Sequence, residues 1–232
     1  MIKKRTGDSL YRACIFDLDG TLSDTLESIA YYSNAALTQC GYRAIPAADY
    51  RRIVGDGADM QMHRMLNTLR GEGNYTEEEI KSLRSVYNAL YASDPLYLVK
   101  PYPGMAKTLS LLKQTGLRTA VLSNKPDAWT QPIAQGLYPA GSFDLCIGQR
   151  PEIPRKPAPD GALLIAREFG VQPAECLYVG DTNTDMKTGA AAGMVTVGVL
   201  WGFRGRQELE ENHAHYIIEK PEELGQIAAG LR

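Results

Sequence analysis

The chain has 232 residues, a mass of 25.5 kDa and a formal net charge of −2. Its 44% hydrophobic and 22% charged residues are typical of a globular protein that can bury a core without disulfide or metal cross-links. The near-neutral charge argues against a nucleic-acid partner, which would require a basic surface. No apolar run is long enough for a membrane span, and polar rather than apolar residues follow the basic segment at 3–5, which argues against a secretion signal.

The four cysteines are Cys14, Cys40, Cys146 and Cys176, and none of them forms a C-x-x-C pair. Cys14 and Cys146 lie in apolar runs, which predicts buried free thiols. Free thiols are typical of a reducing compartment, so we expect a cytoplasmic protein. We further expect a monomer or a weak dimer.

The first predicted element is a strand at 11–16, an apolar run that ends at an Asp-rich turn and is typical of a strand buried on both faces. Helices are then predicted at 26–40, 58–69 and 76–92, and no convincing strand lies among them. Thr76 and Glu79 have the spacing of a capping box at the start of the third helix. Residues 23–97 are therefore predicted to form an all-helical module.

From the Pro-rich segment at 101–104 onward, helices and apolar strands alternate. Strands are predicted at 118–122, 143–147, 177–179, 195–200 and 216–218. Helices are predicted at 105–114, 127–136, 159–169, 184–192 and 221–231. Such alternation is typical of a parallel sheet with helices on both faces. The sequence thus predicts an α/β fold, a doubly wound, Rossmann-like core of residues 10–22 and 98–232 with an inserted helical cap of residues 23–97.

Polar residues follow the predicted core strands, at the edge where such sheets bind ligands. Asp17 and Asp19 come directly after the first strand, and Gly20 allows the chain to turn sharply there. Ser123 and Asn124 come after the second core strand. A hydroxyl, an amide and the backbone N–H groups of a following helix suit a phosphate.

The remaining candidates are Lys156, in a segment stiffened by prolines, and Asp181 and Asp185, near a predicted helix start. Carboxylate oxygens can hold Mg²⁺, which offsets the repulsion between an anionic nucleophile and a phosphate. A lysine stabilises the equatorial oxygens during phosphoryl transfer, and a carboxylate nucleophile divides the transfer into two easier steps. Together the residues predict magnesium-dependent phosphoryl transfer.

Taken alone, each motif has a structural alternative. Asp17 and Asp19 could be turn residues, Asp181 and Asp185 could cap a helix, and Lys156 could be a solvated charge. Four motifs in order, each at a strand end or in the loop where it is needed, favour the chemical interpretation.

The ordered set resembles the motifs of the haloacid dehalogenase superfamily over residues 11–201. The matching motifs are Asp17-Leu18-Asp19-Gly20-Thr21, Ser123-Asn124, Lys156-Pro157 and Gly180-Asp181 with Asp185. The resemblance implies that Asp17 attacks phosphorus, and that Asp19 protonates the leaving group and then activates water. It implies that Lys156 neutralises charge and orients Asp17.

The resemblance also implies which residues hold the substrate and the metal. Thr21 supports the Asp loop beside the substrate, and Ser123 and Asn124 bind the phosphoryl oxygens. Mg²⁺ is expected to be held by four acidic residues, Asp17, Asp19 through its backbone oxygen, Asp181 and, through water or by orienting the others, Asp185.

The helical insertion resembles the cap of phosphoglycolate phosphatases and their relatives, which hydrolyse small phosphorylated organic acids or sugars. The similar segments are Arg51-Arg52-Ile53-Val54-Gly55-Asp56-Gly57 and residues 101–104. Gly55 and Asp56 are therefore predicted to contact the substrate, and the charge of Asp56 is expected to disfavour substrates with a second anionic group, including phosphoglycolate. Arg51 and Arg52 are either a solvated helix face or ligands of the substrate phosphate.

Two alternatives remain open. A hexose-phosphate mutase of similar architecture usually carries a cap arginine and a histidine, where this chain has Ala58 and Ile29. A receiver-type signalling domain also uses a phosphoaccepting Asp, magnesium, a hydroxyl and a lysine. Receivers lack the long helical insertion and the acid at Asp19, so the sequence favours a phosphatase acting on a small phosphorylated metabolite.

Overall fold

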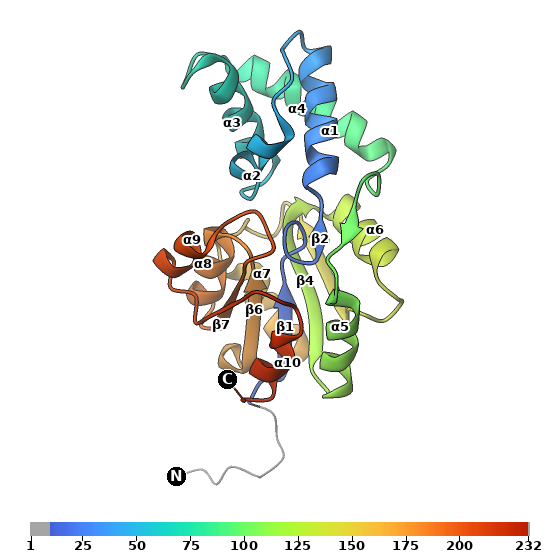
Figure 1. The fold of residues 1–232 in the computed structure, drawn as a ribbon, viewed down its shortest axis with the longest axis vertical. Coiled ribbons are helices and arrows are strands. Elements are labelled where there is room, and N and C mark those ends of the chain that lie inside the picture. The colour runs from blue at the N-terminus through green and yellow to red at the C-terminus, as the bar shows by residue number, and fades with distance from the viewer. Residues whose placement is uncertain (1–9, 232) are drawn as a thin grey trace.

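A six-stranded parallel sheet forms the centre of the lower part of the molecule in Figure 1. The structure is a computed structural model that describes residues 10–231, so the basic segment at 3–5 lies outside the described residues. The strands are β1 Ala13–Phe16, β4 Arg118–Pro126, β5 Leu145–Gln149, β6 Cys176–Gly180, β7 Val195–Val199 and β8 Tyr216–Ile218. Their order is β5-β4-β1-β6-β7-β8, with every neighbouring pair parallel. The predicted doubly wound α/β fold is confirmed.

Alternate side chains of β1 point to opposite faces of the sheet, and helices cover both faces. The helices of this part are α5 Met105–Gln114, α6 Asp127–Leu137, α7 Asp160–Phe169, α8 Asn183–Ala191, α9 Arg206–Glu211 and α10 Glu223–Ala228. Cys14 and Phe16 share a buried cluster with α5 and α10. Ala13 and Ile15 share the other cluster with α7. Burial of all four β1 side chains explains why this strand reads as a continuous apolar run.

A bundle of helices stands above the carboxyl ends of β1, β4 and β6 (Figure 1). Its elements are α1 Leu26–Gln39, the 3₁₀ turn η1 Ala47–Asp49, α2 Tyr50–Ile53, α3 Ala58–Arg70 and α4 Glu77–Ser93. Helix α4 packs on both α1 and α3, and Met62, Leu66 and Leu83 are fully buried inside the bundle. The predicted capping box is present, since Thr76 Oγ1 accepts from Glu79 N and Glu79 Oε2 accepts from Thr76 N.

The two chain crossings between the bundle and the sheet part form a small ribbon that the sequence did not predict. Strand β2 Ser23–Asp24 pairs antiparallel with β3 Lys100–Pro101. Two-residue strands carry no periodic pattern of apolar residues, so nothing in the sequence distinguishes them from a linker. The ribbon holds both crossings side by side, next to the loop that follows β1.

Several other elements differ from their predicted bounds. Strand β4 continues to Pro126, so Ser123 and Asn124 lie within the strand rather than after it. The short helices α2 and α9 were not predicted, because one or two turns give too few residues to establish a helical period. All four cysteines are free, with Cys14 and Cys176 buried. Among the described residues, no helix is both long and apolar enough to span a bilayer.

The capping box of α4 should contribute measurably to stability. Replacing Thr76 by Ala removes the acceptor for the Glu79 N–H, and losing such a cap typically costs about 1 kcal/mol. For a chain of this size we expect the melting temperature to fall by about 2 to 4 °C in calorimetry. Thr68→Ala is the control, because that exposed hydroxyl bonds only to the Arg64 carbonyl within α3. An equal loss in both variants would contradict a capping role.

Candidate active site

The loop after β1 places Asp17 at the carboxyl edge of the sheet. The Asp17 N–H donates to Val179 O of the neighbouring strand at 2.9 Å, which continues the ladder one residue beyond β1. The chain then turns back tightly, because Leu18 O accepts from the N–H groups of Leu22 and Ser23. Gly20 has a φ of +84°, a backbone conformation that glycine adopts without strain.

Lys156 connects the acidic residues of the site. Its Nζ lies 2.8 Å from Asp17 Oδ1 and 2.7 Å from Asp185 Oδ1, and all three side chains are buried. The two carboxylates hold this buried cation in place, and removing both of them would leave its charge uncompensated. This geometry agrees with the predicted role of Lys156 as a neighbour that orients Asp17.

The Asn124 side chain supports Lys156. Its side-chain amide is bonded in both directions to the backbone of Lys156, with Nδ2 donating to Lys156 O at 3.0 Å and Oδ1 accepting from Lys156 N at 2.9 Å. These bonds fix the Asn124 side chain against the Lys156 backbone. Its Nδ2 has a second N–H, and the binding of a phosphoryl oxygen by Asn124 stays a prediction. Ser123 is different, because its Oγ accepts from Lys125 N at 3.1 Å and keeps its own proton for a ligand.

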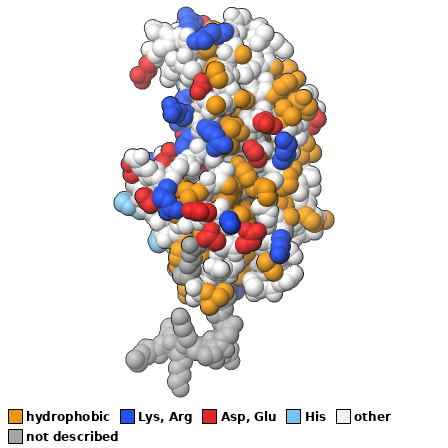
Figure 2. Space-filling view, in the orientation of Figure 1, with side chains coloured by type: hydrophobic (Ala, Val, Ile, Leu, Met, Phe, Trp, Pro, Cys, Tyr) orange, Lys and Arg blue, Asp and Glu red, His pale blue; other side chains and the backbone are white. Residues whose placement is uncertain are grey.

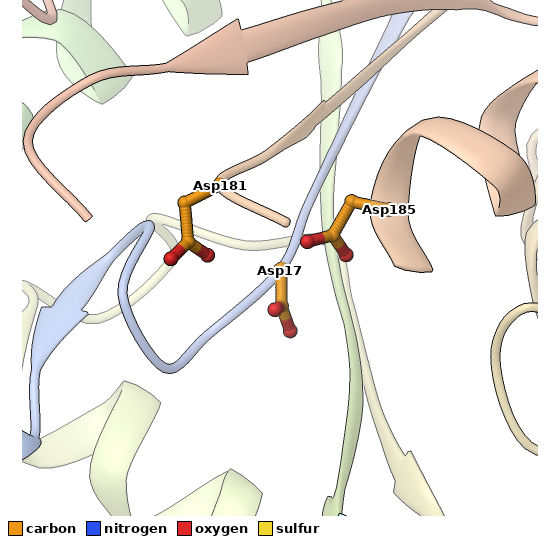
Figure 3. A group of neighbouring side chains, drawn as sticks. All are labelled: Asp17, Asp181 and Asp185. Atoms are coloured by element: carbon orange, nitrogen blue, oxygen red, sulfur yellow. The ribbon is translucent and has the colours of Figure 1, made fainter. Parts of the chain in front are cut away.

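Three carboxylates, those of Asp17, Asp181 and Asp185, point toward one space (Figure 3). Each offers one oxygen, and these three oxygens lie within 4.8 Å of one another. Burial, together with repulsion from Asp185, raises the pKa of Asp17 to about 7 against the lowering effect of Lys156. Burial and the other two carboxylates likewise raise the pKa of Asp181 well above its ordinary value.

The charges of this cluster suit a divalent cation. Three carboxylates and the Lys156 ammonium leave a formal charge of −2, and a raised pKa is the expected response of crowded carboxylates without a counterion. Oxygen ligands in this number are those that Mg²⁺ accepts together with water and substrate phosphate. The residues present therefore fit the predicted metal.

Asp181 is held from several sides. Its Oδ1 accepts from Thr21 Oγ1 at 3.1 Å and its Oδ2 accepts from Phe203 N at 2.7 Å. A Cβ at Gly20 would lie 2.3 Å from Asp181 Oδ2, and a Cβ at Gly202 would lie 2.3 Å from its Cβ. Thr21 is fully buried and contacts this carboxylate instead of facing the pocket, so it positions a candidate metal ligand rather than the substrate. Gly202 and Phe203 were missed, because their role depends on close packing that sequence patterns do not reveal.

Asp185 is oriented by its own helix. Its Oδ2 accepts from the N–H and the hydroxyl of Thr182, at 3.1 and 2.8 Å, in a capping box that starts α8. Its Oδ1 accepts from Lys156, so both oxygens already have donors. These donors fix the direction of the Asp185 carboxylate within the cluster, as Thr21 and Phe203 do for Asp181.

A pocket lies between the sheet edge and the helical bundle, with a cavity volume of about 50 Å³. Asp17, Asp19, Ser123 and Lys156 line its lower side. The bundle contributes seven residues to its lining, Ile29, Val54, Gly55, Gly57, Ala58, Gln61 and Tyr87. The predicted position of Gly55 beside the substrate space agrees with this lining.

Asp56 does not face this pocket, contrary to our expectation. Its carboxylate pairs with Arg64 within the bundle and accepts a hydrogen bond from Thr184 Oγ1 of α8. Hydrogen bonds from both partners help keep the pKa of Asp56 low in spite of partial burial. Glycines on either side let the backbone turn so that the side chain points away from the substrate space. Asp56 therefore connects the bundle to the sheet part and does not select substrates by direct contact.

Arginines reinforce this connection. Arg204 donates to the carbonyls of Arg51 and Val54, the latter at 2.7 Å, and Arg51 Nη1 donates to Gly202 O at 2.8 Å. Figure 2 shows Lys and Arg side chains near the level where the two parts meet. Of the two arginines left open in the sequence, Arg51 thus forms a boundary contact, and Arg52 is an exposed residue of α2 that lines an outer groove with Arg64.

Lys125 is a pocket residue to which the sequence assigned no role. Its Nζ lies 3.2 and 3.1 Å from the two carboxylate oxygens of Asp19. Its neighbours Ser123 and Asn124 drew attention because they match a known motif, whereas a lysine at a strand end has no chemical signature of its own.

Comparison with known proteins places the chain in a family. Residues 11–193 match the haloacid dehalogenase-like hydrolases. This chain belongs to that family. A phosphoglycolate phosphatase of Aquifex aeolicus is 30% identical to it, covering 92% of this chain and 94% of the relative. One of Escherichia coli is also 30% identical, covering 92% and 90%. The predicted family is thereby confirmed, and so is the prediction of a phosphatase.

Solved structures agree with this assignment. A crystal structure of a predicted phosphoglycolate phosphatase from Lactobacillus delbrueckii has a TM-score of 0.88 and 30% identity to this chain. The match covers 95% of this chain and 99% of the Lactobacillus chain. A β-phosphoglucomutase of Clostridium difficile shares the fold, with a TM-score of 0.72 and 21% identity. The match covers 92% of this chain and 93% of the mutase chain. The receiver alternative is excluded by the family match.

Magnesium should stabilise the protein, and more so at higher pH. Because the folded state binds the Asp17 proton more tightly than the unfolded chain does, the metal-free protein loses stability as pH rises from about 4 to about 7. Mg²⁺ replaces that proton, so at about 100 times its Kd it should raise the melting temperature by about 5 to 10 °C near pH 8 and by less near pH 5.

Thermal denaturation with and without MgCl₂ at both pH values measures this effect. Asp181→Asn should remove most of it, because the amide keeps the shape of the carboxylate but not its charge. Asp160→Asn, an exposed acid at the start of α7, is the matched control. Equal Mg²⁺ shifts in the wild type and Asp181→Asn would show that the cluster is not the metal site.

Proposed function

We propose that this enzyme is a Mg²⁺-dependent phosphomonoester hydrolase that transfers a phosphoryl group to Asp17. The observation that carries the proposal is the contact of the Asp17 carboxylate with Lys156, at the floor of a pocket and beside two further buried carboxylates. The bound ion would be held by Asp17, Asp181 and the backbone oxygen of Asp19, with Asp185 orienting the cluster, and would supply positive charge against the phosphate. A nucleophile held this way is oriented before the substrate arrives.

In the first step, an Asp17 oxygen forms a bond to phosphorus while the bond from phosphorus to the ester oxygen breaks. Asp19 gives its proton to the departing oxygen. Lys156 and the Ser123 hydroxyl stabilise the equatorial oxygens. In the second step, Asp19 takes a proton from water, the water oxygen bonds to phosphorus, and the bond to Asp17 breaks. Phosphate is released and both carboxyl groups return to their starting states.

We propose a small phosphorylated metabolite as the substrate, because the bundle covers the pocket. Phosphoglycolate is the first compound to test, since the relatives at 30% identity carry its name. The mutase alternative is disfavoured by the pocket itself. Ile29 and Ala58 line it, and neither can accept a proton or pair with a second phosphate.

We also propose that residues 23–97 act as a cap that opens and closes over a core of residues 10–22 and 98–232. The ribbon of β2 and β3 joins the two parts beside the Asp17 loop, which places a hinge next to the nucleophile. Contacts of Arg51, Asp56 and Arg204 would then hold the cap closed. Closure excludes bulk water and commits the substrate to reaction.

Asp17→Asn should abolish turnover without unfolding the protein. An amide has the same shape but cannot form the anionic nucleophile. Phosphate release from p-nitrophenyl phosphate and from phosphoglycolate is measured with Mg²⁺, after chelation, and with Ca²⁺ in its place. Chelation should stop the wild type, and Ca²⁺ should inhibit it, because calcium requires longer bonds and more ligands. Appreciable turnover by the pure variant would refute the assignment of Asp17.

Weakening the cap contact should raise KM. Thr184→Val removes the hydrogen bond to Asp56 at nearly constant shape, and a bond to a charged group contributes enough that we expect KM to increase up to about tenfold. Thr188→Val is the matched control, because its hydroxyl bonds to the Thr184 carbonyl inside α8. Steady-state kinetics on one substrate compares the two. Unchanged KM in Thr184→Val, or the same increase in both variants, would argue against a cap contact that controls binding.

A further inference from the structure

Lys125 occupies a different part of the pocket from Lys156. Among the described residues that line the pocket, these two lysines are the cationic side chains. Lys156 is committed to Asp17 and Asp185 on the sheet side. Lys125 contacts the bundle instead, because its Nζ lies 4.5 Å from the centre of the Tyr91 ring of α4. An in-line leaving group departs away from Asp17, so it moves toward the bundle and toward Lys125.

The surroundings of Lys125 keep its ammonium group charged and largely shielded from solvent. Its side chain is 5% exposed, and Asp19 is its carboxylate partner. Burial opposes the charge, but Asp19 and the tyrosines outweigh burial and hold the pKa of Lys125 above its ordinary value. The Tyr91 ring in turn packs against Trp129 of α6, with ring centres 4.8 Å apart, so the ring that contacts the ammonium joins the two parts of the molecule.

Such an ammonium requires an anionic partner at all times. An unpaired buried charge is costly, and the ring of Tyr91 contributes much less than a carboxylate does. Asp19, however, must turn toward the ester oxygen during the proposed reaction. A substrate whose leaving group brings its own anion can replace Asp19 as the partner of Lys125, whereas a neutral leaving group cannot.

We propose that Lys125 is the specificity-determining residue for phosphate esters whose leaving group carries a carboxylate close to the ester oxygen. The substrate carboxylate takes the place of Asp19 on Lys125. The released Asp19 carboxylate takes up a proton from water and turns toward the ester oxygen, to which it gives that proton. The inference rests on the proposed function and deepens it by naming the substrate class. It reverses our expectation that the charge of Asp56 disfavours substrates with a second anionic group. The Asp56 carboxylate lies outside the pocket and does not repel a second anion there.

The test compares two esters of similar length, phosphoglycolate and 2-hydroxyethyl phosphate, which differ in the charge at the end of the leaving group. Lys125→Met keeps an unbranched apolar stem and removes the charge. The ratio of kcat/KM for phosphoglycolate to that for 2-hydroxyethyl phosphate should fall about 10- to 100-fold, the effect of losing one charge-assisted hydrogen bond. Lys125→Arg should retain more of this ratio than Lys125→Met does.

Binding provides a second measurement that needs no turnover. In the Asp17→Asn background, calorimetry with Mg²⁺ should show that Lys125→Met weakens the binding of phosphoglycolate more than the binding of 2-hydroxyethyl phosphate. A wild type that hydrolyses neither ester nor p-nitrophenyl phosphate would refute the proposed function, and the binding comparison would still decide the role of Lys125. Equal effects of Lys125→Met on both esters would overturn the inference and leave Lys125 as a residue that only orients Asp19. No effect on either ester would also overturn it.

Discussion

The site depends on one buried ammonium placed between two carboxylates. Without the Lys156 contacts to Asp17 and Asp185, three acids would meet at the sheet edge with no fixed counterion, and repulsion would favour their protonation or separation. The parallel register of β1 and β6 makes this crowding unavoidable, since Phe16 lies level with Val179 and the acids follow both strands. The Asn124 side chain, bonded twice to the Lys156 backbone, can thus be understood as support for this ammonium.

The fold and the positions of Asp17, Asp19, Lys156, Asp181 and Asp185 were predictable for a common reason. Apolar runs of strand length locate the strands, and parallel strands bring the residues after their carboxyl ends to one edge. Side-chain directions were not predictable in the same way. Thr21 and Asn124 turn inward to support other residues, and Asp56 turns out of the pocket. Each direction depends on backbone dihedral angles and on partners distant in sequence, which no local pattern encodes.

Side-chain directions at the boundary between the bundle and the sheet part were also not predictable from the sequence. Arg51 and Asp56 have the composition of a substrate-binding loop, yet their partners are Gly202 and Thr184 of the sheet part. Thr184 directly precedes Asp185, and Gly202 packs against Asp181. The bundle therefore contacts the sheet part through residues adjacent to the acidic cluster. On the proposed cap movement, a change in the position of the bundle would therefore reach residues that adjoin the candidate metal ligands.

Tyr91 and Lys125 form a second boundary contact, on the side of the pocket formed by β4 and α6. The surroundings of Lys156 and of Lys125 differ in their net charge. Around Lys156 the acids exceed the cations by two charges, which a divalent ion can balance. Around Lys125 and Asp19 the charges already balance, so an incoming anion is tolerated only by displacing the Asp19 carboxylate. On the proposed function, a pocket with this division of charge would accept the phosphate at one end by adding a metal. At the other end it would accept an anionic leaving group by exchanging the partner of Lys125.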